Sequence, residues 1–320
     1  MRPKLIIFLI MLISCGLFSQ SIDEEPARVV QDIDLYEYIP FQKESKVALL
    51  NGESNFKLED NLPRLDGATA FYPVYSSFVQ AVYPSGKYPF FQGIVRCTQT
   101  PKAYENLING EADIIFCFEP SKDQIAQAKA KGLEFSMTPI GKDAFVFFVN
   151  RNNPVNNLTP QQIQDIYSGK ITNWKDIGGG NNAIIPYQRP KDSGSQTILE
   201  LIMGDVPIME PLKENVVVGM MGIIEQVSEY KNHSNAIGYS FLFFATEMVK
   251  NNEIKLLAIN GVKPSKETIQ SNKYTFSNEF YAITTGNETE NTKLFIEWIL
   301  SEEGQYLVEK TGYIPIKGKK

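Results

Sequence analysis

Strand-like and helix-like segments alternate along most of this chain, and this alternation is the feature that most restricts its fold. Residues 90–97, 113–118 and 144–149 are apolar runs rich in β-branched and aromatic side chains, which predicts buried strands. Segment 72–83, in contrast, places its apolar residues at helical spacing. Because strands that alternate with helices usually pair through crossover connections, the pattern predicts an α/β fold with a mostly parallel sheet covered by helices on both faces.

The length and charge of the chain restrict its organisation and its partners. A single hydrophobic core stops growing at about 250 residues, and this chain has 320, which predicts two lobes. The formal net charge of -6 argues against a nucleic-acid partner, which needs clustered lysine and arginine. It does not exclude a small anion, because oriented backbone N–H groups and one arginine can hold an anion whatever the sign of the whole surface.

The N-terminus has the pattern of an export signal. A positively charged start is followed by the apolar residues 5–13 and by Leu-Ile-Ser-Cys, which ends at Cys15. Because Leu-Ile-Ser-Cys resembles a bacterial lipobox, residues 1–20 are interpreted as a signal peptide with a lipobox, and Cys15 as the lipidation site that anchors the protein to a bacterial membrane. The polar segment 21–44 is interpreted as a linker. The alternative is a plain secretory signal that is cut near Gln20, and both interpretations place the mature protein outside the cytoplasm.

Residues 187–200 combine an arginine, two hydroxyls and a glycine directly before an apolar helical run. The first N–H groups of a helix have no intrahelical partner and carry partial positive charge, so an anion can bind there. Ser193, Gly194 and Ser195 would form the start of this helix, with Arg189 beside it. The sequence therefore predicts an oxyanion site. The alternative is an ordinary helix cap with a surface arginine nearby.

Cys97 and Cys117 both lie in apolar, strand-like runs. In an exported protein they could form a disulfide, but buried thiols suit the same positions, so both alternatives stay open. The sequence has no cysteine or histidine spacing typical of a zinc site. We therefore expect neither a metal nor a cofactor.

Several segments, taken in order, resemble the phosphate-binding periplasmic protein family, the solute receptors of ABC-type phosphate importers. The most specific is residues 158–179, which include Tyr-Ser-Gly-Lys-Ile-Thr-Asn-Trp. Arg189 followed by Ser193-Gly194-Ser195 is similar to the Arg and Ser-Gly-Thr anion loop of the family. Residues 66–70, 237–239 and 312–315 look like further family landmarks, so the resemblance extends from about residue 65 to the C-terminus.

The resemblance implies a two-lobed, type II periplasmic-binding-protein-like fold, in which each lobe is a mostly parallel sheet flanked by helices and two strands form the hinge. Lobe I would comprise residues 45–141 and 276–320, and lobe II residues 142–275. Inorganic phosphate would bind between the lobes and be delivered to the membrane permease of an ABC importer. Carried over position by position, the ligand-binding residues are Thr69, Ala70, Thr98, Thr100, Glu119, Arg189, Ser193, Gly194 and Ser195.

The chain departs from the family pattern directly after the strand predicted at 113–118. The family has small residues there, followed by an aspartate that accepts the proton of phosphate, whereas this chain reads Cys117-Phe118-Glu119-Pro120. Glu119 or Asp66 is the candidate for that role. Because phosphate can donate a hydrogen bond and sulfate cannot, a buried carboxylate would select phosphate.

Two other functions compete with phosphate transport. A binder or sensor of another oxyanion, sulfate or molybdate, without a transport role would keep the same fold. An exported serine hydrolase that uses Ser193 or Ser195 would need a general base, and the single histidine, His233, lies in a polar segment. We therefore expect a monomeric binding protein and no enzyme.

Overall fold

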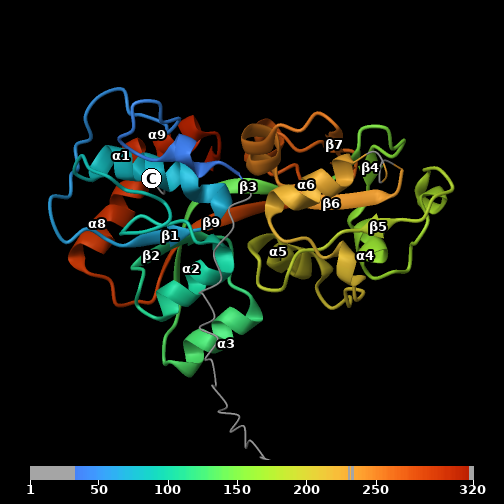
Figure 1. The fold of residues 1–320 in the computed structure, drawn as a ribbon, viewed down its shortest axis with the longest axis horizontal. Coiled ribbons are helices and arrows are strands. Elements are labelled where there is room, and N and C mark those ends of the chain that lie inside the picture. Colours follow the sequence, from blue (N-terminus) through green and yellow to red (C-terminus); the bar gives the residue numbers. More distant parts are fainter. Residues whose placement is uncertain (1–32, 230, 232–233, 317–320) are drawn as a thin grey trace, which may run out of the picture.

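The computed structural model describes residues 33–229, 231 and 234–316. Figure 1 shows two halves joined by the long strands β3 (Ser136–Asn150) and β9 (Ser277–Thr284). The predicted signal peptide, the lipobox with Cys15, residues 21–32 of the 21–44 linker and His233 lie outside the described residues. The rest of that segment is folded: Leu35–Tyr38 form a 3₁₀ helix, and Leu35 and Ile39 are buried in the core. Within the described part of the chain, no helix is both long enough and apolar enough to cross a membrane.

One eight-stranded sheet extends through both halves. The main path follows β1 (Leu65–Gly67), β2 (Ile114–Cys117), β9, β3, β6 (Ala236–Phe241) and β5 (Ile185–Pro186), and β10 (Ile314–Pro315) and β7 (Ile254–Leu256) also pair with β3. The short strands β4 (Asn157–Leu158) and β8 (Ala258–Ile259) form a separate sheet. The predicted α/β architecture is therefore confirmed.

The strand directions differ from the prediction of a mostly parallel sheet. Strands β1 and β2 are parallel, as are β5 and β6. Strand β9, however, is antiparallel to both β2 and β3, and β3 is antiparallel to β6, so the sheet is mixed. The reason is that β9 comes late in the chain yet inserts between β2 and β3. Apolar periodicity contains no information about which distant strand becomes a neighbour.

Strand β3 is shared by the two halves. Its first part pairs with β9 up to Ala144, and residues 145–149 pair with β6. Residues 144–149 are completely buried, because helices cover both faces of the sheet, and this explains why the run is continuously apolar and does not alternate. A register shift between Pro139 and Gly141 interrupts the pairing of β3 with β9.

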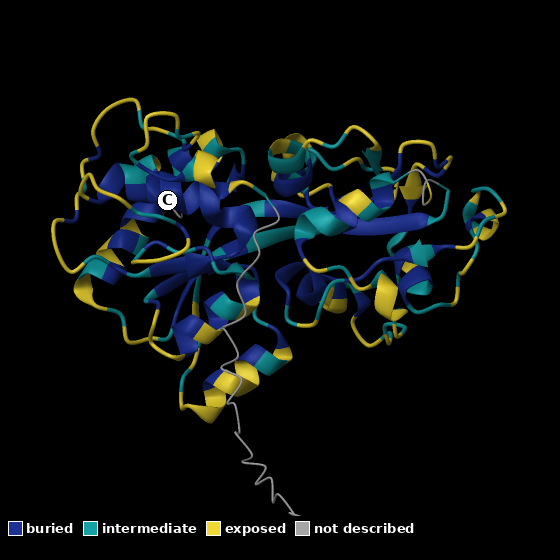
Figure 2. Cartoon of the chain, viewed as in Figure 1, coloured by how far each residue is buried: buried dark blue, intermediate teal, exposed yellow. Residues whose placement is uncertain are grey.

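Nine α-helices are described, and they flank the sheet. They are α1 (Tyr72–Val82), α2 (Gln99–Ile108), α3 (Lys122–Ala130), α4 (Pro160–Tyr167), α5 (Gly194–Met203), α6 (Met220–Ser228), α7 (Lys266–Gln270), α8 (Glu290–Ile299) and α9 (Glu302–Thr311). Figure 2 shows buried strands through the centre of both halves, with exposed residues on the outer loops and the outer helix faces. The amphipathic helices thus bury their apolar faces against the sheet.

The segment 90–97 is not a strand, so the prediction of a strand there is wrong. Only Val95 forms an isolated bridge, with Leu65. The ring of Phe90 instead packs edge-on against Tyr36 and Tyr72, at centroid distances of 5.1 and 5.9 Å. Aromatic packing by a loop buries this apolar run without strand pairing.

Cys97 and Cys117 are both buried and form no disulfide within the described chain. Burial raises the pKa of the Cys97 thiol to about 12. A thiol that stays protonated is neither a nucleophile nor a metal ligand. Of the two alternatives, the structure shows buried thiols that pack as small apolar side chains.

Candidate functional site

A cavity of about 240 Å³ lies where the two halves meet. Its lining comes from four separate stretches of the chain and from the ends of two strands. The residues of the first half are Ala68, Thr69, Ala70, Phe71, Gln99, Thr100, Pro101 and Phe118, and those of the second half are Arg189, Pro190, Ser193, Gly194, Ser195, Val218, Gly219, Met220 and Phe241. Because both halves supply walls, neither half alone encloses the space.

Four helix N-termini meet at this cavity. The 3₁₀ turn η2 (Thr69–Phe71) leads into α1, while α2 begins with Gln99, α5 with Gly194 and α6 with Met220. At each of these starts, the N-cap residue makes no side-chain hydrogen bond to the first turn, and no acidic residue lies in that turn. The positive ends of these helices therefore act on whatever occupies the cavity.

The other described α-helices are capped. Side-chain oxygens of Ser121, Thr159, Ser265, Thr289 and Ser301 accept hydrogen bonds from the first turns of α3, α4, α7, α8 and α9. A missing N-cap typically costs about 1 kcal/mol of stability. Uncapped α-helices that gather at one cavity indicate a place where an external anion supplies the missing acceptors.

Arg189 enters the cavity from the loop after β5. Its backbone N–H donates to Tyr239 Oη at 2.9 Å and to Gln196 Oε1 at 3.1 Å, which fixes the main chain at this position. The side chain is half-buried, and its Nε and Nη1 atoms are shielded from solvent. A Cβ built on Gly194 would lie 3.0 Å from Thr100 Oγ1, so the starts of α2 and α5 face each other closely.

Ser193 directly precedes α5 and lines the cavity. It is only 6% exposed, and its Oγ has no hydrogen-bond partner among the described residues. The preceding residue, Asp192, has a φ of 64°, a left-handed conformation that is unfavourable for a residue with a side chain. An unpartnered buried hydroxyl costs roughly 1–3 kcal/mol, and an anion in the cavity would satisfy it.

If phosphate binds in this cavity as the sequence predicts, Ser193→Ala should weaken its binding about tenfold or more without destabilising the ligand-free protein. The variant loses a hydrogen bond to a charged ligand, which contributes about 1.5–3 kcal/mol, but loses no hydrogen bond within the described protein. Titration calorimetry measures the affinity, and urea unfolding measures the stability.

Ser240→Ala is the matched control for this substitution. Ser240 Oγ is also buried and has no hydrogen-bond partner among the described residues, but it lies in β6 outside the cavity lining. The control should therefore leave phosphate affinity unchanged. If Ser193→Ala bound phosphate as tightly as the control, the serine would have no ligand role.

The structure brings most of the predicted ligand residues together. Those that line the cavity are Thr69, Ala70, Thr100, Arg189, Ser193, Gly194 and Ser195. Thr98 and Glu119 are placed outside the lining. Thr98 is hydrogen-bonded to Asp66, and Glu119 is hydrogen-bonded to Tyr281.

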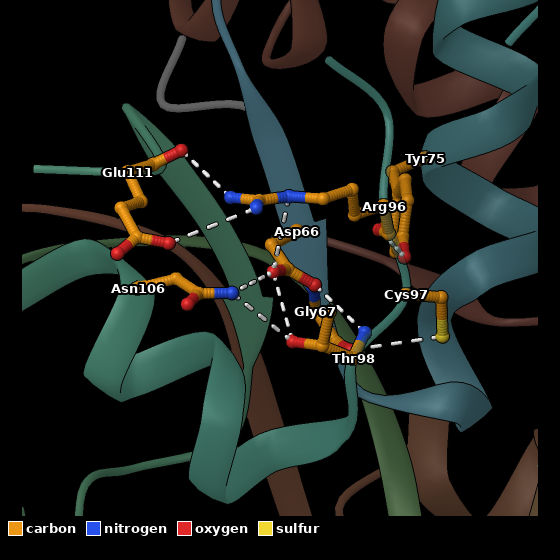
Figure 3. A network of polar contacts seen from close by, with 8 residues as sticks. All are labelled: Asp66, Gly67, Tyr75, Arg96, Cys97, Thr98, Asn106 and Glu111. Atoms are coloured by element: carbon orange, nitrogen blue, oxygen red, sulfur yellow. Dashed lines mark hydrogen bonds and ion pairs between the residues drawn. The ribbon is translucent and has the colours of Figure 1, made fainter. Parts of the chain in front are cut away.

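Asp66 is the centre of a buried polar network that includes Thr98 (Figure 3). Its carboxylate is fully buried and accepts hydrogen bonds from Thr98 N at 2.8 Å, Thr98 Oγ1 at 2.9 Å and Asn106 Nδ2 at 2.7 Å. It also accepts from the Gly67 backbone N–H at 2.8 Å and lies 3.7 Å from Arg96 Nε. This network holds the turn before α2. Asp66 and Thr98 thus position the helix start and do not face the cavity.

Glu119 is directed toward a strand. Its Oε1 accepts a hydrogen bond from Tyr281 Oη of β9 at 3.1 Å. Burial raises the pKa of this carboxyl group. Among the described residues, the cavity lining contains neither aspartate nor glutamate, so the ionisable side chain that it offers is the cationic Arg189.

The sequence analysis missed the apolar part of the lining. Phe118 follows β2 and Phe241 ends β6, and the carboxyl ends of strands are where α/β proteins bind ligands. That rule could have identified both. For Val218 and Met220, the sequence offers one weak signal. Gly219 directly precedes the apolar helix α6, in the same way that Ser193 precedes α5.

Contacts between the halves lie beside the cavity. Ser121 Oγ donates to Asp192 Oδ1 at 2.6 Å, and Gln124 Nε2 donates to the Asp192 carbonyl oxygen at 3.3 Å. Lys191 forms an ion pair with Asp123. The start of α3 is therefore joined to the loop that precedes α5, and the two halves are in direct contact at this point.

Comparison of sequences connects the chain with known binding proteins. The family model of the PBP superfamily domain matches residues 61–303. The phosphate-binding protein PstS of Borreliella burgdorferi is 30% identical over 186 residues, which cover 56% of this chain and 66% of that protein. The PstS protein of Staphylococcus epidermidis is 27% identical over 227 residues, which cover 67% of each. The matches thus span about two thirds of the length of these relatives.

Solved structures agree in fold. A protein from Clostridium perfringens, crystallised with bound phosphate and assigned as a phosphate ABC transporter substrate-binding protein, is 26% identical with a TM-score of 0.60, and the match covers 82% of this chain and 100% of that one. An ABC-type phosphate transport receptor from Vibrio cholerae has a TM-score of 0.58 at 20% identity, and the match covers 79% and 99% of the two chains. These relatives are named as binding proteins and receptors. Because the family model covers more than half of the chain, this protein belongs to the PBP superfamily and is a distant relative of the PstS phosphate-binding proteins.

Proposed function

We propose that this protein is a receptor that binds phosphate between its halves and delivers it to the membrane permease of an ABC-type importer. The observation that carries the proposal is the meeting of four uncapped helix starts with Arg189 at one cavity. Helix N-termini favour small anions, and a planar guanidinium matches the edge of a tetrahedral oxyanion. The names of the relatives support phosphate as that anion.

The proposed ligand contacts are divided between the halves. Thr69 and Thr100 would supply hydroxyls from the first half, together with the backbone N–H groups of η2 and α2. The second half would supply the Arg189 side chain, the hydroxyls of Ser193 and Ser195, and the free N–H groups at the start of α5. Such a set consists of donors, as an anion requires. Thr98 has a positioning role through Asp66 in this proposal.

The proposed binding movement is a hinge closure of two lobes, residues 45–141 with 276–320, and residues 142–275. Two strands, β3 and β9, connect the lobes, and bending of a few residues in each would open the cavity. The hinge is assigned to 141–145 and 274–281, next to the register shift in β3. The contacts of Asp192 with Ser121 and Gln124 would then form only in the closed state.

The proposed location is outside the cytoplasm, on a bacterial membrane. The sequence supports it through the charged start, the apolar residues 5–13 and the lipobox-like Leu-Ile-Ser-Cys. Cys15 would carry the lipid, and the segment between it and the folded residues that begin near Leu35 would be the tether. Such an anchor would keep a monomeric receptor close to its permease.

The proposed function is tested by calorimetric titration of residues 21–320 with phosphate, sulfate and molybdate at pH 6 and pH 8. We expect one phosphate site with higher affinity at pH 8, because a lining of donors prefers the dianion that predominates there. Sulfate should compete, since the described lining has no carboxylate to repel it.

The alternatives give different results in the same titrations. Tighter binding of sulfate or molybdate than of phosphate would identify a receptor or sensor for that oxyanion. An absence of binding by all three anions would reject the proposed function.

A further inference from the structure

The proposed anion site fills only part of the cavity. A protein cavity of about 150 Å³ can hold a benzene molecule, which has six non-hydrogen atoms, and this cavity measures about 240 Å³. Inorganic phosphate has five non-hydrogen atoms. With phosphate at the helix starts, the remaining space must therefore hold water or a further part of the ligand.

The cavity lining also includes apolar side chains. The rings of Phe118 and Phe241 stack on each other at a centroid distance of 4.1 Å, and Phe71 packs on Phe118 at 4.9 Å. These three rings are at most 2% exposed, so they form the buried base of the apolar wall. Val218 and Met220 border the same cavity at the start of α6, and Val218 is 77% exposed. Water gains little from such walls, whereas an apolar group that covered them would be removed from water favourably.

The polar walls point to the same conclusion. They offer the donors of Arg189 and of the helix starts, together with hydroxyls that can donate or accept, and among the described residues no carboxylate lines the cavity that could accept a hydrogen bond from a P–OH group. Asp66 is occupied by its own network, and Glu119 is bonded to Tyr281. In a phosphate monoester or a phosphonate, the substituent that replaces one P–OH group is an organic group. The other three oxygens can then all accept hydrogen bonds as a dianion.

On the basis of the proposed anion site, we propose that the preferred ligand is an organic phosphate or phosphonate, R–OPO₃²⁻ or R–PO₃²⁻, with an apolar group R. The three free oxygens lie at the helix starts with Arg189 and Ser193. The group R lies against the exposed side chain of Val218 and against Met220, next to the buried Phe118–Phe241 pair. This assigns the otherwise unexplained apolar surface at the mouth of the cavity to substrate recognition.

The test compares phenyl phosphate, methyl phosphate, inorganic phosphate and phenol by calorimetry on residues 21–320 at pH 8. We expect phenyl phosphate to bind at least about tenfold more tightly than inorganic phosphate, methyl phosphate to lie between them, and phenol not to bind measurably. Inorganic phosphate that binds as tightly as phenyl phosphate would overturn the inference and leave the proposed function intact. If none of the phosphates bound, the proposed function itself would fail, and the inference with it.

A substitution locates the organic group. Val218→Ser should weaken phenyl phosphate binding several-fold more than it weakens inorganic phosphate binding, because the apolar contact that it reduces is the contact with R. Val216→Ser is the matched control, since Val216 lies in the same loop, is 36% exposed and is not part of the lining. Equal losses for both ligands, or an equal loss in the control, would contradict the placement of R.

Discussion

In Arg189→Ala, the affinity for phosphate is expected to fall by at least about 30-fold. The anion loses its cationic partner in a site that is shielded from solvent, and removal of one partner of such a charge pair costs about 2–5 kcal/mol. The contacts that shape the loop should survive, because Tyr239 Oη and Gln196 Oε1 are bonded to the backbone N–H of Arg189 and not to its side chain. Titration calorimetry gives the affinity, and circular dichroism checks the fold.

Two further variants distinguish a general charge effect from a specific contact. Arg189→Lys keeps the charge but loses the planar fork of donors, so it should retain only part of the affinity. Arg151→Ala removes a cation of the same type that is paired with Glu253 on the surface at 3.3 Å, and it should leave phosphate binding unchanged. If both Arg189 variants bound phosphate as tightly as the wild type, the cavity would not be the anion site.

The largest effect on stability is expected for Asp143→Asn, which should remove a strong pH dependence. Asp143 lies in β3 and is only 2% exposed. Its Oδ1 accepts a hydrogen bond from Ala144 N at 2.8 Å, and both carboxylate oxygens lie 3.4 Å from Phe243 N. Burial raises the pKa of Asp143 from 3.8 to about 7, although these hydrogen bonds and the charge of Lys266 act in the opposite direction.

The direction of the pH effect follows from this raised pKa. Between about pH 4 and pH 7 the folded protein binds the proton of Asp143 and the unfolded chain does not, so the free energy of unfolding falls as the pH rises through this range. The total loss is roughly 4 kcal/mol. Asparagine has a similar shape and no charge, so the variant should be more stable than the wild type at pH 8 and should lack this decline.

Urea unfolding of both proteins at several pH values between 4 and 8 measures the difference. Asp205→Asn serves as the control, because Asp205 is exposed in the turn after α5. Parallel stability curves for wild type and Asp143→Asn would show that Asp143 ionises in the folded protein at its ordinary pKa.

The fold class was predictable because its signals are local. The apolar run 144–149 and the amphipathic spacing in 72–83 reflect which faces are buried, and the structure confirms β3 and α1 there. The direction of the strands was not predictable in the same way. Strand β9 is placed between β2 and β3 by contacts over long separations in the sequence, and no short pattern encodes them.

In the candidate site, too, the features that depend on neighbouring residues were predictable and those that depend on packing were not. The Ser193-Gly194-Ser195 helix start with Arg189 could be identified from a few consecutive residues, because capping and helix-dipole effects act within one turn. The positions of Asp66 and Glu119 could not be identified in this way. One carboxylate is bonded to Thr98 and Asn106 and the other to Tyr281, and these partners are decided by packing.

By itself, the sequence determined the α/β class and the helix start at Gly194, because each depends on residues that are neighbours in the chain. Only the tertiary structure decided that four helix starts meet at one cavity and that the stacked pair Phe118 and Phe241 forms part of its wall. Those features combine segments from both halves of the molecule. Their arrangement depends on how the whole sheet assembles, and the chemistry of any single segment does not specify it.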